Sequence, residues 1–323
     1  MRQILVISDI HYASDGEAAR CGHEARVIGN PVLRRASQLM RYWIWLREPH
    51  GHNHRLNRLI EANPLPDWVV ANGDFSLDSG FIGVSDPEAY ESARLALGQL
   101  RVAYGSRLRT TLGDHELGKK SLFGGAGGVR LASWERAVGG LGIPGFWCEQ
   151  LGRFVLVGVA STPIALPVFL PEMLPSETEA WRRIAEELRG QVRETFGGLE
   201  PGQRVVLFVH DPSALPFLAE LPEVRARMDQ IGCTVVGHLH TPAVFRLGSH
   251  LAGMPVIPFL GNTVRRYSTA LRRARIWKEF RTVLCPSPSG IQLLKDGGWL
   301  ELRLSEDGPG LVQVLRRRLP WEI

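Results

Sequence analysis

The stretch TTLGDHELG, residues 110–118, joins a strand-like run to a glycine and then to three ionisable side chains in a row. These are Asp114, His115 and Glu116. Burying ionised groups at the end of an apolar strand is costly unless a partner of opposite charge compensates them. The pattern therefore predicts that a bound cation offsets this charge.

Five strand-like runs in the chain end in this way. The polar side chains are Asp9 and His11 after residues 3–8, Asp74 after 67–72, Asp114 and His115 after 108–112, His210 at the end of 204–210, and His238 and His240 after 233–236. In open α/β sheets, ligands bind outside the carboxyl ends of the strands. Five such endings predict one shared site at that edge.

The residue types point to metal binding. Carboxylate oxygen combined with imidazole nitrogen suits Mn²⁺, Fe or Zn²⁺ better than Ca²⁺ or Mg²⁺. Asp9 and His11 lie two residues apart, as do His238 and His240, so each pair would share one side of an extended strand end. Seven candidate ligands are too many for one ion, whereas two ions bridged by a carboxylate would use them all. A pair of ions about 3.5–4 Å apart can clamp a phosphoryl group.

Taken together, these motifs resemble the calcineurin-like metallophosphoesterase superfamily from residue 5 to residue 240. The matching motifs are Asp9-x-His11, Gly73-Asp74, Gly113-Asp114-His115-Glu116, His210 and Gly237-His238-Leu239-His240. The resemblance implies that Asp9, His11 and His240 hold one divalent ion, that Asp114, His210 and His238 hold a second, and that Asp74 bridges the two. It also implies a double β-sheet sandwich flanked by helices, and attack of metal-bound hydroxide on a phosphomonoester, phosphodiester or pyrophosphate.

Two residues of the TTLGDHELG stretch, His115 and Asp114, differ from the other candidate residues. The resemblance gives His115 no metal, but places it near the leaving-group oxygen as a proton donor or electrostatic stabiliser. Asp114 departs from the family, which usually has asparagine there. The added carboxylate predicts tighter metal binding, a less electrophilic metal pair and stronger repulsion of an anionic phosphate.

The rest of the chain favours an α/β layered fold. Continuous β-branched runs suit sheets that are covered on both faces. Helices are predicted over residues 86–105, between an Asp86 cap and Gly105, and over 175–198, with Ser176 as N-cap. Residues 290–315 predict antiparallel strands joined at Asp-Gly turns, which close one sheet. We expect one metallophosphoesterase domain over residues 1–323, with insertions at about 20–60 and 243–283.

Composition narrows the partners and the compartment. The net charge of +5 indicates a phosphorylated substrate, nucleic acid or an anionic membrane. The four cysteines, Cys21, Cys148, Cys233 and Cys285, form no CxxC pair, which is typical of reduced cytoplasmic thiols. No signal-peptide core and no run of about 18 apolar residues are present. We therefore expect a cytoplasmic location, with contact to a membrane surface left open.

Residues 33–63 predict an amphipathic helical region that is interrupted at Pro49. Core packing is the favoured interpretation of its Tyr42, Trp43 and Trp45, and a lipid-facing or substrate-facing surface is the alternative. The three histidines of HGHNH, residues 50–54, are expected in a surface loop. His23 is a candidate for the wall of the site.

Other functions remain open. The aromatic segment and the arginines of residues 264–281 would suit a lipid-linked pyrophosphate at a membrane surface, although the superfamily branch with such a substrate typically has arginine in place of His115. A nuclease is disfavoured because no dedicated nucleic-acid module is seen. A non-catalytic metal-binding scaffold would have no use for the proton donor His115. The expected partner is therefore a phosphorylated small molecule or a lipid-linked substrate.

Overall fold

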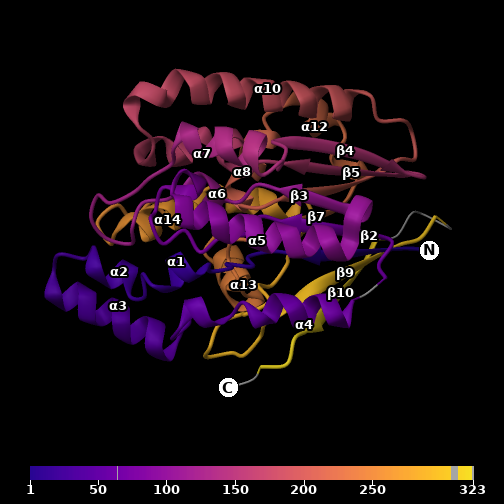
Figure 1. The fold of residues 1–323 in the computed structure, drawn as a ribbon. Coiled ribbons are helices and arrows are strands. Elements are labelled where there is room, and N and C mark those ends of the chain that lie inside the picture. The colour runs from indigo at the N-terminus through magenta and orange to yellow at the C-terminus, as the bar shows by residue number, and fades with distance from the viewer. Residues whose placement is uncertain (64, 307–311, 322–323) are drawn as a thin grey trace.

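Two five-stranded β-sheets pack in layers with helices on their outer faces (Figure 1). The computed structural model describes residues 1–63, 65–306 and 312–321. The first sheet contains, in spatial order, β10 (Val312–Arg318), β9 (Gly298–Leu304), β1 (Arg2–Ile7), β2 (Trp68–Asn72) and β3 (Leu108–Thr111). The second contains β4 (Phe146–Leu151), β5 (Phe154–Val159), β6 (Arg204–Val209), β7 (Ile231–Val236) and β8 (Thr282–Leu284).

Both sheets are mixed. Strands β1, β2 and β3 are parallel to one another, and so are β5, β6, β7 and β8. Strand β9 runs antiparallel to both β1 and β10, and β4 runs antiparallel to β5. The predicted layered double sheet is confirmed. The polar side chains singled out in the sequence follow the edge at which the parallel strands end.

Alternation along β1 divides its side chains between two cores. Ile4 and Val6 face the second sheet and share a buried cluster with Phe208 of β6. Leu5 and Ile7 face the opposite way, into the cluster formed with the covering helices. Burial of each such side chain stabilises the fold by roughly 1.5–3 kcal/mol. This two-sided burial explains why the strand sequence is continuously apolar.

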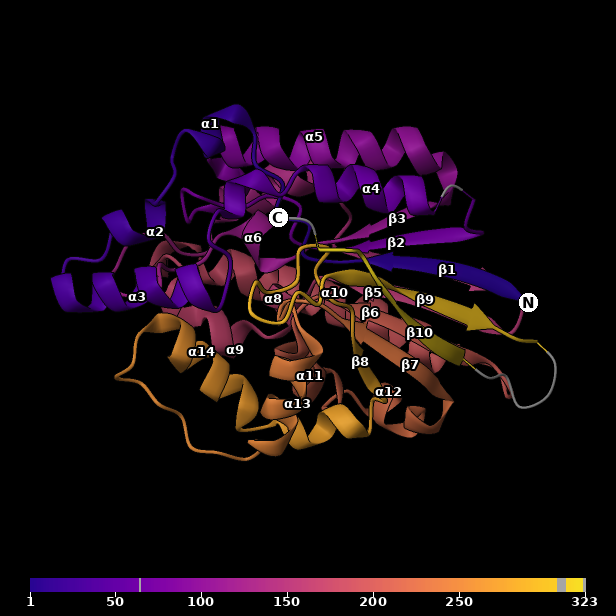
Figure 2. The ribbon, with the colours of Figure 1, turned by 90° about the horizontal axis from the view of Figure 1, so that it is seen from below.

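The α-helices lie in the connections between the strands. They are α1 (Asp15–Ala18), α2 (His23–Arg26), α3 (Pro31–Trp43), α4 (His54–Ala62), α5 (Pro87–Tyr104), α6 (Asp114–Leu117), α7 (Leu131–Glu135), α8 (Ser161–Ile164), α9 (Leu166–Phe169), α10 (Thr178–Gly197), α11 (Leu215–Leu218), α12 (Pro222–Ala226), α13 (Pro242–His250) and α14 (Asn262–Leu271). Helices α4 and α5 lie along the first sheet, and α10 lies along the second (Figures 1 and 2). No described helix is long and apolar enough to cross a membrane.

Several predicted element boundaries are confirmed and others are wrong. Asp86 caps α5, and Gly105 ends it, as predicted. Ser176 does not cap α10, because Pro175 starts a 3₁₀ turn over Pro175–Glu177 and the helix begins only at Thr178. The short strands β4 and β8 were not predicted.

The C-terminal hairpin is confirmed only in its second half. Strands β9 and β10 pair antiparallel at the edge of the first sheet, and the Asp307-Gly308 turn lies outside the described residues. Residues 291–294 form no strand. Their backbone bonds residues 44–45 instead, with Gln292 N donating to Trp45 O and Leu293 N to Ile44 O.

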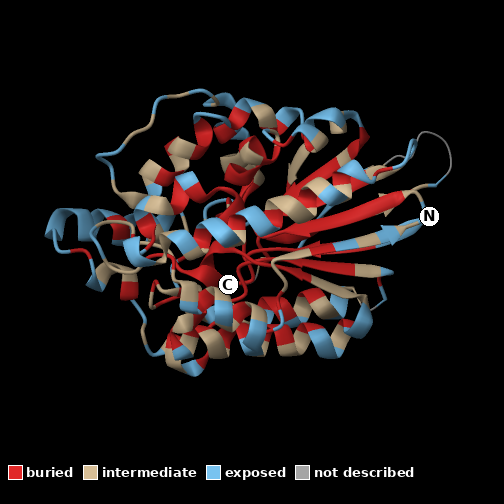
Figure 3. Ribbon diagram, turned by 90° about the horizontal axis from the view of Figure 1, so that it is seen from above, coloured by how far each residue is buried: buried red, intermediate tan, exposed pale blue. Residues whose placement is uncertain are grey.

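The aromatic region was only partly predicted. It forms α3, a 3₁₀ turn at Pro49–Gly51 and α4, so the predicted interruption is present. Core packing is wrong for Trp43, which is 64% exposed, and for Tyr42, which is 37% exposed. Figure 3 shows the central strands mostly buried and α3, at the left end of the molecule, largely exposed.

Candidate metal centre

Seven carboxylate and imidazole side chains meet at the carboxyl ends of the parallel strands. Asp9 and His11 follow β1, Asp74 follows β2, Asp114 follows β3, His210 follows β6, and His238 and His240 follow β7. All are buried except His238, which is partly exposed. Folding thus brings together residues that are up to 231 positions apart, from 9 to 240.

Tight turns, rather than extended strand ends, direct these side chains inward. Asp9, His11, Asp74, His238 and His240 all adopt left-handed backbone, with φ between 50° and 64°. The predicted extended Asp9-x-His11 pair is therefore wrong, because β1 ends at Ile7. Such conformations cost of order 1–3 kcal/mol each for non-glycine residues and cluster at functional sites.

His238 and His240 each occupy the centre of a three-residue turn. Leu239 N donates to Gly237 O at 2.7 Å, and Thr241 N donates to Leu239 O at 2.6 Å. A turn of this kind with positive φ at its centre is rare and strained. Two such turns in succession bring both imidazoles to one edge of the second sheet.

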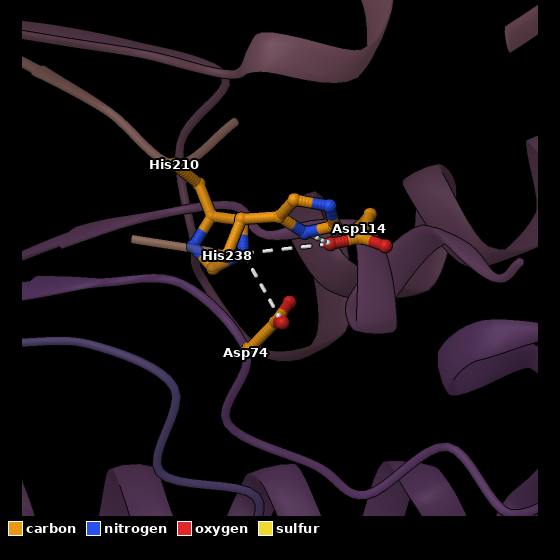
Figure 4. Close-up of side chains that lie close together, drawn as sticks. All are labelled: Asp74, Asp114, His210 and His238. Atoms are coloured by element: carbon orange, nitrogen blue, oxygen red, sulfur yellow. Dashed lines mark hydrogen bonds and ion pairs between the residues drawn. The ribbon is translucent and has the colours of Figure 1, made fainter. Parts of the chain in front are cut away.

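The candidate ligand atoms divide into two neighbouring groups. Those of Asp74, Asp114, His210 and His238 lie within 4.8 Å of one another (Figure 4), and so do those of Asp9, His11 and His240. This is the division that the family resemblance implies. Asp74 also lies within the same range of His11 and His115. Asp74 therefore lies between the two groups, where a bridging carboxylate would stand.

Backbone carbonyl groups orient the imidazoles. His210 Nδ1 lies 2.6 Å from Asn72 O, and His11 Nδ1 lies 3.3 Å from Ser76 O. A carbonyl oxygen only accepts hydrogen bonds, so Nδ1 is the donor in both rings and Nε2 faces the other candidate ligands. Metal-bound histidines are usually oriented in this way.

The buried charges of the centre are only partly paired by protein atoms. Asp74 Oδ2 and His210 Nε2 lie 3.1 Å apart without hydrogen-bond geometry, and neither has another hydrogen-bond partner among the described residues. Burial lowers the pKa of His210, but the charges of Asp74 and Asp114 outweigh it and hold this pKa well above its ordinary value. A divalent ion would replace that proton and satisfy both atoms. The residues present therefore fit a divalent-ion centre.

An arginine of α14 reaches Asp114, the aspartate that departs from the predicted motif. Arg266, from α14, is buried, and its Nη2 lies 3.1 Å from Asp114 Oδ2. His238 Nδ1 lies 2.8 Å from the other oxygen, Oδ1. Burial raises the pKa of Asp114, but His238 and Arg266 hold it well below its ordinary value. Arg266 therefore offsets the added negative charge of the third carboxylate.

Glu116 holds the turns that carry two of the aspartates. Its carboxylate accepts hydrogen bonds from the backbone N–H of Asp74 at 2.9 Å, Phe75 at 2.7 Å and Gly113 at 3.0 Å. Burial and the charge of Asp74 raise the pKa of Glu116 to about 7. Glu116 thus fixes Asp74 relative to Asp114.

His115 lies beside the centre with a lysine that the sequence reasoning missed. His115 Nδ1 lies 2.9 Å from Leu77 O, and Nε2 contacts Lys119 Nζ. Burial lowers the pKa of His115 well below its ordinary value, and Lys119 adds to the effect against the opposing charge of Asp74. The imidazole is therefore neutral. The spacing of four residues from His115 to Lys119 was the only signal in the sequence.

A cavity of about 350 Å³ opens onto the centre. Its wall contains apolar side chains, among them Met40, Trp45, Leu46, Leu122 and Val244, and the cationic side chains Arg41, Lys119, Lys120 and Arg266. Trp45 lies with its ring centroid 5.0 Å from that of His240. His23 lines the cavity, as the sequence allowed, whereas the three histidines of residues 50–54 do not. The centre is thus reached through a largely apolar passage with cationic groups.

Comparison with known proteins agrees with this geometry. The model of the calcineurin-like phosphoesterase family matches residues 2–242. A solved dimetal phosphatase from Danio rerio is 14% identical over 98% of each chain, with a TM-score of 0.50. A putative 5'-nucleotidase from Staphylococcus aureus is 14% identical over 98% of this chain and 54% of its own, with a TM-score of 0.40. The phosphopantetheinyl hydrolase of Mycobacterium tuberculosis is 18% identical over 75% and 84%, with a TM-score of 0.36.

The likeness to solved structures and the match to the family model support different conclusions. At 14% identity, the likeness to the Danio rerio phosphatase shows a shared fold alone. No curated protein sequence matches the chain significantly. The family match covers three quarters of the chain and includes every candidate ligand. The chain belongs to the calcineurin-like phosphoesterase family and is a metal-dependent phosphoester hydrolase.

Proposed function

We propose that this chain hydrolyses a phosphomonoester, phosphodiester or pyrophosphate at a dinuclear centre of Mn²⁺, Fe or Zn²⁺. The proposed ligands are Asp9, His11 and His240 for one ion, Asp114, His210 and His238 for the other, and Asp74 as the bridge. Residues 1–323 would form one catalytic domain, and the insertions at about 20–60 and 243–283 would supply cavity wall through Met40 and Arg266.

One observation carries this proposal. Asp74 belongs to the group of Asp114, His210 and His238 and also lies within 4.8 Å of His11, a member of the other group, and its buried Oδ2 lacks a hydrogen-bond partner among the described residues. A buried ionised oxygen without such a partner is costly unless a cation lies beside it. Two divalent ions at these groups would polarise the phosphoryl oxygens and lower the pKa of a bound water.

Two cationic side chains have separate proposed tasks. Arg266 Nη1 is buried and has no hydrogen bond among the described residues, where its ion pair is with Glu172 at 3.8 Å, so it can donate to a phosphoryl oxygen in the cavity. Lys119 Nζ is a hydrogen-bond donor and contacts His115 Nε2. We assign this pair to protonation of the leaving-group oxygen: Lys119 would give up the proton and be left neutral, and His115, whose own N–H faces Leu77 O, would hold Nζ in place.

The proposal predicts a metal-dependent turnover that needs His115. Metal-stripped protein should not hydrolyse an aryl phosphodiester or monoester, and titration with Mn²⁺ should restore the activity. His115→Ala should lower kcat roughly 10²-fold, because a general acid contributes about that much or more. Metal content, measured by mass spectrometry, should stay unchanged in this variant.

The matched control is His54→Ala, since His54 is exposed and lies outside the cavity wall. It should keep wild-type kinetics. Turnover without added metal, or full activity in His115→Ala, would contradict the proposal. A loss of bound metal in His115→Ala would make His115 a ligand instead. The ratio of diester to monoester rates selects between the substrate classes.

Metal removal should also lower thermal stability. An ion present at about 1,000 times its dissociation constant adds roughly 4 kcal/mol to the free energy of unfolding. For a chain of 323 residues, whose unfolding entropy is about 0.7 kcal/mol/K, that corresponds to a fall of about 6 °C on chelation. Melting curves with chelator and with Mn²⁺ measure the shift. His210→Ala should remove most of the response, and an unchanged Mn²⁺ response in this variant would rule His210 out as a ligand.

A further inference from the structure

Helix α3 is the most exposed long helix of the N-terminal insertion. Of its 13 residues, only Ser37 is buried. Of the eighteen large apolar side chains that are exposed among the described residues, eight lie within residues 27–44. Isolated exposed apolar residues are ordinary, but a cluster of this kind marks a contact surface.

The apolar residues of α3 form one stripe. Val32, Leu39 and Trp43 are spaced by seven and four positions, so they lie on the same side of the helix. They are 74%, 44% and 64% exposed. Met40 lies at the edge of the stripe and lines the cavity. The stripe therefore leads from solvent to the mouth of the cavity.

Neighbouring segments extend the apolar surface. The backbone of Leu293 bonds that of Ile44, which places the exposed Leu293 and Leu294 next to the end of α3. The segment with the exposed Phe259 and Leu260 lies at the same end of the molecule as α3 in Figures 1 and 2. One end of the protein thus combines the cavity with an exposed apolar rim.

The charge of this surface is one-sided. Residues 25–47 contain five arginines and no acidic residue. Arg35 is exposed beside the apolar stripe, whereas Arg34 lies on the opposite side of α3, where its Nε donates to Ile28 O at 2.9 Å, and Arg41 is paired with Glu24. A helix with an apolar stripe that contains tryptophan and a flanking arginine suits the interface of an anionic membrane.

We propose that the α3 surface, formed by Val32, Leu39, Trp43 and Arg35, docks on an anionic membrane and admits an amphiphilic phosphoester from it. This deepens the proposed function and depends on it for the chemistry. The phosphoryl group would lie at the metal centre beside Arg266. The apolar part would lie along Met40, Leu46, Leu122 and Val244, which line the way out of the centre.

A second copy of the chain fits this surface less well. A symmetric contact places the same patch on both partners. Arg35 would then lie in a contact between two copies of α3, and α3 has no acidic side chain to pair with it. An anionic lipid surface matches both the apolar stripe and the positive charge.

The test is flotation with vesicles. The wild-type protein should bind vesicles of phosphatidylcholine and phosphatidylglycerol in equal parts, and bind phosphatidylcholine alone much more weakly. The Leu39→Gln/Trp43→Gln variant should lose roughly tenfold or more in affinity for the mixed vesicles. Arg34→Gln/Arg35→Gln should lose roughly fivefold or more in affinity, chiefly through Arg35, which lies beside the apolar stripe.

Matched controls use exposed residues elsewhere. Val102→Gln on α5, where Val102 is 91% exposed, controls for loss of an apolar side chain. Arg182→Gln/Arg183→Gln on α10 controls for loss of charge. Both should keep wild-type vesicle binding. For each variant, the rate of hydrolysis of a long-chain dialkyl phosphate in vesicles is divided by its rate on the soluble aryl phosphodiester. This ratio should fall in the variants that bind vesicles more weakly.

The outcomes separate the two proposals. Absence of vesicle binding, or equal binding by wild type and Leu39→Gln/Trp43→Gln, overturns the membrane surface even if the soluble substrate is hydrolysed. A lipid-free dimer that Leu39→Gln/Trp43→Gln dissociates, measured by sedimentation, would assign α3 to a second copy and also overturn it. Vesicle binding without turnover of the soluble or the lipid substrate would retain the docking surface and reject the proposed hydrolysis.

Discussion

Replacing Asp74 with asparagine should lower kcat/KM for an aryl phosphoester roughly 10⁴-fold, because loss of the shared ligand removes about 5 kcal/mol of electrostatic stabilisation. Asp74 is the only candidate aspartate that is shared between the groups of ligands found among the described residues. Asparagine keeps the size of the side chain but removes its charge. The bound metal, measured by mass spectrometry, should fall from two ions per chain to one or none.

Asp86→Asn is a suitable control for this change. Asp86 is a buried aspartate that caps α5, and asparagine is an equally good cap. This variant should keep its metal and its activity. Two tightly bound ions with normal turnover in Asp74→Asn would contradict the bridging role.

The second large effect is expected at Arg266. Arg266→Ala should lower the free energy of unfolding of the metal-free protein by about 3 kcal/mol, since it leaves the buried Asp114 carboxylate with less compensating charge. Asp114→Asn in the same chain should restore most of that loss. A double-mutant cycle in urea should therefore give a coupling energy of about 1.5 kcal/mol or more.

Arg265→Ala provides the matched control for this cycle. Arg265 is adjacent in sequence and pairs with Glu172 at 3.2 Å, and no contact with Asp114 is present in the described structure. Its effect should add to that of Asp114→Asn without coupling. With Mn²⁺ bound, the Arg266–Asp114 coupling energy should be smaller, because the divalent ion would also offset the negative charge of Asp114. Additive effects of Arg266→Ala and Asp114→Asn would show that the two charges act independently.

The strands and the convergence of the polar side chains could be predicted because each depends on local patterns. An apolar run followed by aspartate or histidine specifies a strand and its end, and parallel pairing then brings those ends together. The positive φ angles at His238 and His240 could not be predicted, since non-glycine residues seldom adopt them. Steric preference favours extended backbone there, and tertiary hydrogen bonds override it.

Contacts between distant segments also escaped prediction. The sequence places Arg266 in a basic run, but only the packing of α14 brings it against Asp114. The reading of Trp43 as a core residue failed for a related reason. An amphipathic stripe does not reveal whether its apolar side meets the protein or something outside it. Only the fold shows that α3 is left largely uncovered.

The candidate ligands come from both sheets, so the ligand set is completed only after the two sheets have packed together. Asp74 and Asp114 come from the first sheet, whereas His210 and His238 come from the second. The other group has the same division, because His240 alone joins from the second sheet. On the proposed ligand assignment, neither sheet alone would supply a full set of ligands for either ion, and metal capture would follow the docking of the sheets, which is a late, long-range event in folding. A nascent chain could not complete this centre before residue 240 has been synthesised, so the metals present where folding finishes would influence which ions it acquires.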